Sequence, residues 1–230
     1  MFQRFFGVVA CLVALAGPVW AGPAWAGPVV PVSYDMPNGH GHALGGWYNY
    51  WDKSYSGSGN VETDGAPLTG GLGDLVDGVV PWQIWDDVEN HAGTGPYVGW
   101  ININPTMVFH FEGDPLIEKV RVHTDDSLGQ GGVTPPSAVV VNGTWYPVEL
   151  AEERSGAPFA IEIGGLALRG DVTVQLVRRS AWVFISEVTF EGAVEQEARA
   201  EVEAVAEPGT MALLAGGMLG LMGVRRRSRG

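Results

Sequence analysis

The sequence predicts an all-β domain, an antiparallel β-sandwich of the jelly-roll kind, over residues 32–191. Short segments that alternate apolar and polar residues recur along this region, and Gly, Pro, Asn and Asp separate them. No segment within it shows the 3.6-residue periodicity of an amphipathic helix. Several short strands joined by glycine-rich loops are typical of sandwiches and jelly rolls.

The expected strands are identified by their alternating residues. Residues 106–112, 119–123 and 172–176 each place apolar side chains on one face, and residues 182–190 form a last long strand. The side chains expected to point into the core are Met107, Phe109, Phe111, Val120, Val122, Val172, Val174 and Leu176.

A hairpin is expected within residues 137–150. Asn142 and Gly143 both tolerate the positive φ angles of a type I′ turn. With that turn, Val140 faces Trp145, and Val139 faces Tyr146 in the next register pair.

The first 26 residues are typical of a signal peptide. Arg4 precedes an apolar run over residues 5–16, which is too short to span a bilayer as a helix. Ala24 and Ala26 occupy the two positions that a signal peptidase reads, so we expect cleavage after Ala26.

The C-terminus has three parts that follow a spacer rich in Ala and Glu over residues 192–206. Glu207 and Pro208 come first, then an apolar stretch over residues 210–224, then a basic cluster. The cluster includes Arg225, Arg226 and Arg227. A helix of this stretch would be about 22 Å long, short for a hydrocarbon core of about 30 Å, and the arginines would remain on the cytoplasmic side.

This order over residues 207–230 resembles the PEP-CTERM sorting signal of Gram-negative bacteria, with Ala206 where the motif has its first proline. The resemblance implies a short transmembrane segment that anchors the chain transiently in the inner membrane. It also implies processing by an exosortase and delivery to the cell surface or the extracellular matrix. A plain short membrane tail is the alternative.

Six segments of the middle region follow one another along the chain: residues 74–78, 97–100, 106–111, 118–122, 135–139 and 182–188. Their order resembles the discoidin, or coagulation-factor type C, domain of the galactose-binding-like superfamily. The resemblance covers roughly residues 45–191, with residues 27–44 as a lead-in. It implies an eight-stranded jelly roll whose loops at one end bind ligands, commonly sugars, although this fold also has many scaffold members.

The same resemblance implies a structural Ca²⁺, with Asp77 and Glu187 at the matching positions. Carboxylates and loop carbonyls are the hard oxygen ligands that this ion takes. The alternative is that Asp77 caps a turn and Glu187 is solvated. Cys11, the single cysteine, lies within the expected signal peptide, so the mature domain has no disulfide to stabilise it.

Trp82, Trp85 and Asp86 are the candidate carbohydrate-binding residues. Sugar recognition needs an aromatic plate and a few polar groups that fix the orientation of the ring. Tryptophans more often pack in the core, and for Trp82 and Trp85 both interpretations stay open. The tryptophans expected to pack in or beside strands are Trp100, Trp145 and Trp182.

Charge and motifs limit the function classes. Residues 27–206 hold 25 acidic and 8 basic side chains, which would repel the phosphates of a nucleic acid. Acidic pairs such as Asp86–Asp87 and Asp125–Asp126 are typical of turns or cation ligands rather than of a glycosidase pair. We therefore expect a non-catalytic module that binds an extracellular polysaccharide. A purely structural matrix protein is the alternative, and a glycan-acting enzyme comes third.

Overall fold

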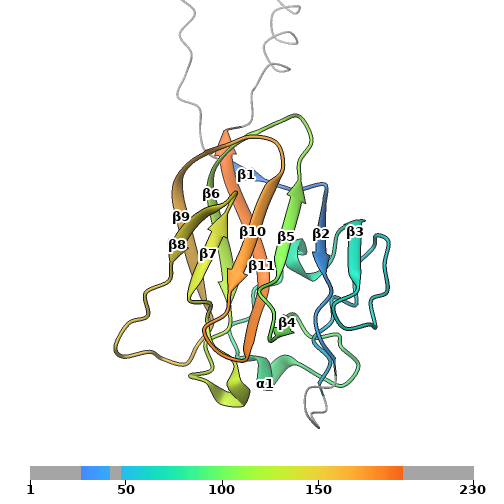
Figure 1. Ribbon diagram of the computed structural model, residues 1–230, viewed down its shortest axis with the longest axis vertical. Coiled ribbons are helices and arrows are strands. Elements are labelled where there is room, and N and C mark those ends of the chain that lie inside the picture. Colours follow the sequence, from blue (N-terminus) through green and yellow to red (C-terminus); the bar gives the residue numbers. More distant parts are fainter. Residues whose placement is uncertain (1–26, 42–47, 194–230) are drawn as a thin grey trace, which may run out of the picture.

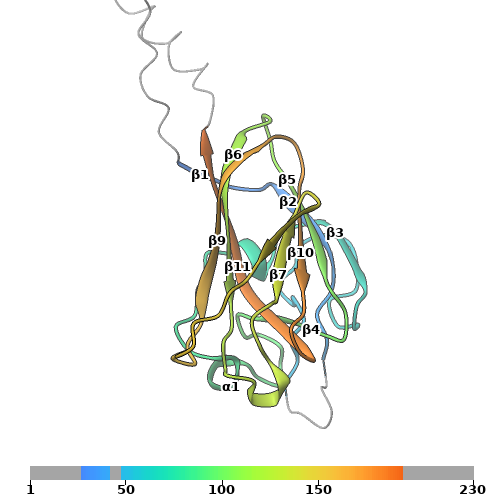
Figure 2. The same ribbon diagram turned by 60° about the vertical axis from the view of Figure 1, so that its left-hand side comes forward.

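Two antiparallel β-sheets face each other in the computed structural model, which describes residues 27–41 and 48–193 (Figures 1 and 2). The predicted all-β sandwich is thus confirmed. The signal-peptide cleavage site, the sorting signal and the spacer beyond residue 193 lie outside the described residues, so the fold does not test the predictions made for them. Gly192 and Ala193, which were expected to begin the spacer, instead end the last strand.

The first sheet is built around its longest strand, β11. Strand β6 pairs along one edge of β11, and β1 and β4 share the other edge. Its strands are β1 (Gly27–Val29), β4 (Val98–Ile101), β6 (Leu116–Thr124), β9 (Phe159–Leu168) and β11 (Trp182–Ala193).

The second sheet has the order β3-β2-β5-β10-β7-β8. Its strands are β2 (Ser33–Pro37), β3 (Pro67–Gly71), β5 (Thr106–His110), β7 (Ala138–Val141), β8 (Thr144–Pro147) and β10 (Val172–Val177). The described residues therefore form eleven strands rather than eight, because short strands border both sheets. Strands β1 and β2 belong to the segment expected to be a lead-in, so the fold includes residues before 45.

In the part of the chain that the structure describes, three short helical turns lie in the loops: η2 (Asp74–Val76), α1 (Trp85–Val88) and η3 (Gln130–Gly132). The expectation that helices occur only in the terminal segments is wrong in this respect. Each turn is three or four residues long, too short to leave a helical periodicity in the sequence.

The predicted hairpin is confirmed. Asn142 and Gly143 have φ angles of 45° and 81°, as a type I′ turn requires. Val140 pairs with Trp145 across β7 and β8, as expected.

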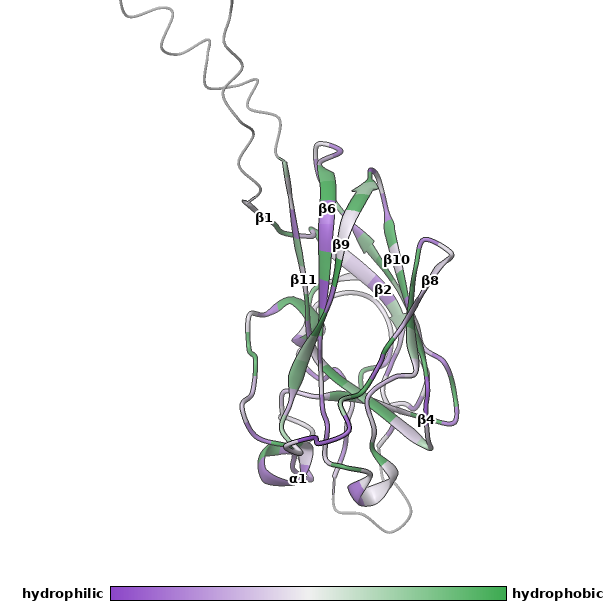
Figure 3. Cartoon of the chain, turned by 90° about the vertical axis from the view of Figure 1, so that its left-hand side faces the viewer, coloured by the Kyte–Doolittle hydropathy of each residue, from purple (hydrophilic) through white to green (hydrophobic). Residues whose placement is uncertain are grey.

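The core fills the space between the sheets. Met107, Phe109, Val120, Val122 and Val174 are all fully buried, as their alternation predicted. Figure 3 shows hydrophobic residues on the strands of both sheets, with hydrophilic residues between them on β6. Phe111, also predicted to be in the core, lies at the margin of the core. It is partly buried, and its ring centroid is 5.0 Å from that of Phe190.

The ends of the described chain lie together, away from the loops that carry α1 and η3 (Figure 1). Gly27 of β1 pairs with Gly192 of β11. The opposite end of the sandwich collects the loop before α1, the loop that contains η3 and the loop between β8 and β9. This loop end has its own aromatic cluster of Tyr50, Trp85, Tyr97, Trp182 and Phe184.

We predict that Val122→Asp lowers the free energy of unfolding by about 4 kcal/mol or more, because it places an unpaired charge between the sheets. Val122 is fully buried and pairs with Val188 and Ile161. The matched control is Val30→Asp, at a side chain that is 71% exposed. Denaturant unfolding measures both changes, and equal stability of the two variants would contradict this placement of the core.

Candidate functional site

A pocket of about 320 Å³ opens between η2 and the loop before α1. Asp74, Asp77, Trp82, Gln83 and Thr94 contribute its polar and aromatic lining. Trp82 is 82% exposed, although its indole is large and apolar. The structure thus brings together Trp82 and Asp77, which the sequence analysis had assigned to two different sites.

Trp85 and Asp86 are placed differently. Trp85 is buried, donates its backbone N–H to Asp125 Oδ2 at 2.8 Å, and donates its indole N–H to Ser127 Oγ at 3.2 Å. Its ring packs at 5.9 Å from that of Tyr50, so it offers no free face to a sugar. Asp86 does not line the pocket. Its carboxylate accepts hydrogen bonds from Tyr48 Oη at 3.3 Å and Gln130 Nε2 at 2.8 Å.

The other three tryptophans lie in strands, and two of them are buried. Trp100 and Trp182 are buried, as predicted. Trp145 lies in a strand and opposite Val140, as expected, but it is 57% exposed and so does not belong to the core. It lies on β8, the edge strand of the second sheet, on the same face as Val140, and this face points away from the core.

The loop that carries Trp82 is held by buried side chains. Tyr97 donates its hydroxyl hydrogen to the carbonyl oxygen of Gln83 at 2.8 Å. The backbone N–H of Tyr97 is bonded to Glu89 Oε1 at 2.8 Å. Gln83, the residue next to Trp82, is therefore anchored to Tyr97, which precedes β4 and belongs to the aromatic cluster, and this fixes the rim of the pocket.

Glu89 is the least satisfied of the buried acids. It is 6% exposed, and its Oε2 has no hydrogen-bond partner among the described residues. Burial raises the pKa of this carboxyl to about 8, and the nearby Asp74 and Asp125 carboxylates add to the rise. Sequence reasoning did not single out Glu89, because burial of a single charged residue leaves no local sequence signal.

Asp52 and Asp74 form a second buried acidic group beside the pocket. Asp52 accepts the hydroxyl hydrogen of Tyr34 and, through Oδ1, the backbone N–H of Asp74 at 3.1 Å. Burial raises the pKa of Asp74 to about 7, and repulsion from Asp52 contributes. Burial also raises the pKa of Asp52.

The two calcium candidates meet at the turn after η2. Glu187 is buried, and its Oε2 accepts the backbone N–H of Gly78 at 3.1 Å. Asp77 Oδ1 accepts the backbone N–H of Val79 at 2.8 Å. Burial raises the pKa of Glu187 to about 7, and the charge of Asp77 adds to it. Asp77 thus caps a turn, and Glu187 is buried rather than solvated; neither observation decides whether the two carboxylates bind an ion.

These residues supply only part of a calcium shell. Ca²⁺ takes about six to eight oxygen ligands, and two carboxylates leave most of them to carbonyls and water. Among residues 27–41 and 48–193, no group of three or more His, Cys, Asp or Glu side chains is arranged to hold a metal ion. The calcium site stays a prediction.

Two family models match the chain. The model described as "Discoidin domain-containing receptor 1/2, DS-like domain" matches residues 31–139. The model of the PEP-CTERM protein-sorting motif matches residues 204–227. Both resemblances inferred from the sequence are confirmed: the chain carries a discoidin-like domain, followed by a PEP-CTERM motif.

The solved structures that match the chain are distant in sequence. A fucolectin from striped bass (Morone saxatilis) serum is 12% identical, with 73% of this chain and 79% of that chain covered and a TM-score of 0.34. Allantoicase from Saccharomyces cerevisiae is 10% identical, with 73% and 72% covered and a TM-score of 0.26. No curated protein matches the sequence. Within the part of the chain that the structure describes, no helix is long and apolar enough to cross a membrane.

We predict that the protein loses stability as the pH rises from about 5 to about 8. In this range Glu89 keeps its proton in the folded state but loses it on unfolding, because its pKa is raised to about 8. The unfolded state then binds fewer protons, so the free energy of unfolding falls by up to about 1.4 kcal/mol per pH unit for each such group. Denaturant unfolding at several pH values measures the slope.

Glu89→Gln should flatten this slope, since the amide keeps an acceptor for the Tyr97 N–H and has no proton to lose in this range. The exposed Glu112 provides the matched control, Glu112→Gln, which should keep the wild-type slope. A Glu89→Gln variant with an unchanged pH profile would contradict the role given to this carboxyl.

Proposed function

We propose that this exported protein binds a neutral carbohydrate, without catalysis, through the pocket at Trp82. The observation that carries the proposal is the 82% exposure of the Trp82 indole at the rim of a pocket with polar side chains. A large apolar ring exposed beside a hollow is typical of a binding surface, and the apolar face of a pyranose is a suitable partner for it.

The polar groups of the pocket suit hydroxyl groups. Asp74 and Asp77 are hydrogen-bond acceptors, while the Gln83 amide and the Thr94 hydroxyl can both donate and accept. Two acids and no basic side chain stand among the described residues that line it. Like charge would repel a uronic or sialic acid, so a neutral sugar is favoured.

The other acids near the pocket support binding rather than catalysis. Glu89 Oε1 accepts the backbone N–H of Tyr97, the residue before β4, and Asp125 Oδ2 accepts that of Trp85 in α1. Asp52 is bonded to Tyr34 and to the backbone of Asp74. In each case the carboxyl group accepts hydrogen bonds that hold a loop in place. These acids therefore position the rim of the pocket and are not presented to a ligand as reactive groups.

The sorting motif supports the location that we propose for this activity. A PEP-CTERM motif over residues 204–227 implies an exported protein that is anchored transiently in the membrane and processed by an exosortase. Display on the cell surface or in the matrix would place many copies side by side, and weak single-site binding would then add up.

We predict that Trp82→Ala weakens binding to a neutral polysaccharide about tenfold or more, a loss of about 1.4 kcal/mol, because the stacking face is removed. Trp145→Ala is the matched control, since Trp145 is also exposed but lies on β8, away from the pocket. A glycan array and a polysaccharide pull-down compare the variants with the wild type. Absence of binding to every neutral glycan would favour the purely structural alternative.

We predict that Ca²⁺ raises the melting temperature and that a chelator lowers it, because an ion that binds only the folded state stabilises it by mass action. Asp77 and Glu187 would hold the ion in part, and their repulsion in its absence would be relieved. Glu187→Gln should remove the response, while Glu112→Gln should keep it. A melting temperature that ignores both Ca²⁺ and chelator would eliminate the calcium site.

We predict that the mature protein lacks both ends of the chain. The signal peptide would be removed after Ala26, and the exosortase would remove the arginines of residues 225–229. The intact mass of the protein recovered from its native host measures this. A surface-exposed form that still carries residues 225–230 would contradict exosortase processing.

A further inference from the structure

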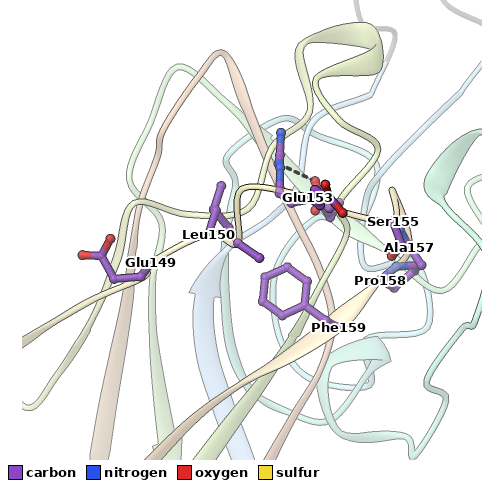
Figure 4. Close-up of a pocket in the computed structure, with 10 residues that line it drawn as sticks. Glu149, Leu150, Glu153, Ser155, Ala157, Pro158 and Phe159 are labelled. Carbon is purple, nitrogen blue, oxygen red and sulfur yellow. Dashed lines mark hydrogen bonds and ion pairs between the residues drawn. The ribbon is translucent and has the colours of Figure 1, made fainter.

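A second hollow, of about 260 Å³, lies between the β8–β9 loop and the start of the loop that follows β6 (Figure 4). It shares no lining residue with the Trp82 pocket. Its polar side chains include Asp126, Glu153, Arg154 and Ser155. No function discussed so far uses these residues.

An ion pair fixes the polar side of the hollow. Arg154 Nη1 donates to Asp126 Oδ1 at 2.7 Å, and this contact is drawn as a dashed line in Figure 4. The backbone N–H of Leu128 is bonded to the same oxygen at 3.3 Å. Asp126 is 3% exposed, so the ion pair is shielded from water and holds the guanidinium firmly.

The ion pair leaves hydrogen-bonding groups unused. Both bonds to Asp126 end on Oδ1, and within the described residues none ends on Oδ2. Arg154 makes its hydrogen bond there through Nη1 alone, so Nε and Nη2 keep their donors. A free acceptor and free donors thus stand side by side in a fixed relation.

The opposite wall of the hollow is apolar. Leu150 extends toward the Phe159 ring in Figure 4, and Ala157 and Pro158 complete the apolar lining. Leu150 also packs against the main core, which supports this wall from below. The hollow therefore has a polar side, formed by the Arg154–Asp126 ion pair, and an apolar side. A ligand with one polar and one apolar face would fit in a single orientation.

We propose that this hollow is a second carbohydrate site, which binds one neutral pyranose ring through two adjacent hydroxyl groups. One hydroxyl would donate to Asp126 Oδ2, and its neighbour would accept from the Arg154 guanidinium. The C–H face of the ring would lie against Phe159 and Leu150. The volume is near the lower end of the range for ligand pockets, about 300 Å³, which suits a single ring.

The charges around the hollow select against acidic sugars. Asp126, Glu149 and Glu153 outnumber the single cation, Arg154, which is already paired. Two separate sites on one domain would let a polysaccharide with repeated rings bind at both, with a gain in avidity. The second site needs no residue of the Trp82 pocket, so it can be tested separately from the proposed function.

The test is a titration of the full-length protein with methyl glycosides of galactose, mannose and fucose, followed by NMR. The Arg154 Nε–H signal reports on the second site, and the Trp82 indole N–H signal reports on the first. We expect the Arg154 signal to shift with at least one glycoside. We also expect sorbitol, which has adjacent hydroxyls but no ring, to leave the signal in place.

Two variants locate the effect. Ala157→Phe fills the hollow and leaves the Arg154–Asp126 ion pair in place, so it should weaken the Arg154 response about tenfold or more, a loss of about 1.4 kcal/mol, with the Trp82 response unchanged. Glu152→Gln, in the same loop but outside the lining, is the matched control. Arg154→Lys should also weaken binding, because it removes the planar fork but keeps the charge.

The outcomes separate the two sites. An Arg154 signal that no glycoside shifts, or that sorbitol shifts equally, would overturn the second site even where Trp82 responds. A response of Arg154 without any response of Trp82 would support the second site and count against the proposed function. An Ala157→Phe variant that binds as the wild type does would place the sugar elsewhere and overturn the proposal.

Discussion

The loop end of this domain depends on the carboxylate of Asp125. It is fully buried and accepts the backbone N–H groups of Trp85 at 2.8 Å and Ser127 at 2.9 Å. Its own N–H is bonded to the carbonyl oxygen of Phe184 in β11. Three segments that are far apart in the sequence are thereby joined. Since a buried carboxylate without such donors is very costly, this arrangement specifies where α1 begins. Trp85 then enters the aromatic cluster, and Trp82, three residues earlier, stays at the rim of the pocket.

Several acids in and around the Trp82 pocket are buried at a cost in stability. The pKa values of Asp74, Glu89 and Glu187 all rise to between about 7 and 8, mainly through burial and secondarily through repulsion from neighbouring carboxylates. Such a cluster reduces stability at neutral pH, and in natural proteins this kind of conflict is concentrated at functional sites. The domain also separates its ends: β11 finishes at Ala193, away from α1 and η3 (Figure 1). The loops therefore face away from the point where the chain continues toward its sorting motif.

Much of the fold could be predicted because its strands and its hairpin leave local sequence patterns. Alternation identified the inward faces of β5, β6 and β10, and Asn142–Gly143 identified the hairpin. The candidate site was predictable only in part. Trp82 and Trp85 lie in the same short stretch of sequence, yet one is exposed and the other is buried. This difference in burial arises from Asp125, forty residues farther along the chain, whose carboxylate accepts the backbone N–H of Trp85. Alternation also cannot tell which face of an edge strand points outward, so the exposure of Trp145 was not predicted. The hollow at Arg154 depends on its pairing with Asp126 in a distant loop, which no local sequence pattern records.

The central claim is that a rigid loop end presents Trp82 to a neutral sugar. NMR of the tryptophan indole N–H signals during a titration with a neutral oligosaccharide tests it most directly, because Trp82 and Trp85 lie three residues apart in different environments. We expect the Trp82 signal to shift, while the signal of Trp85, whose indole N–H donates to Ser127, stays in place. A Trp82 signal that remains fixed at saturating sugar, or equal shifts of both signals, would contradict it.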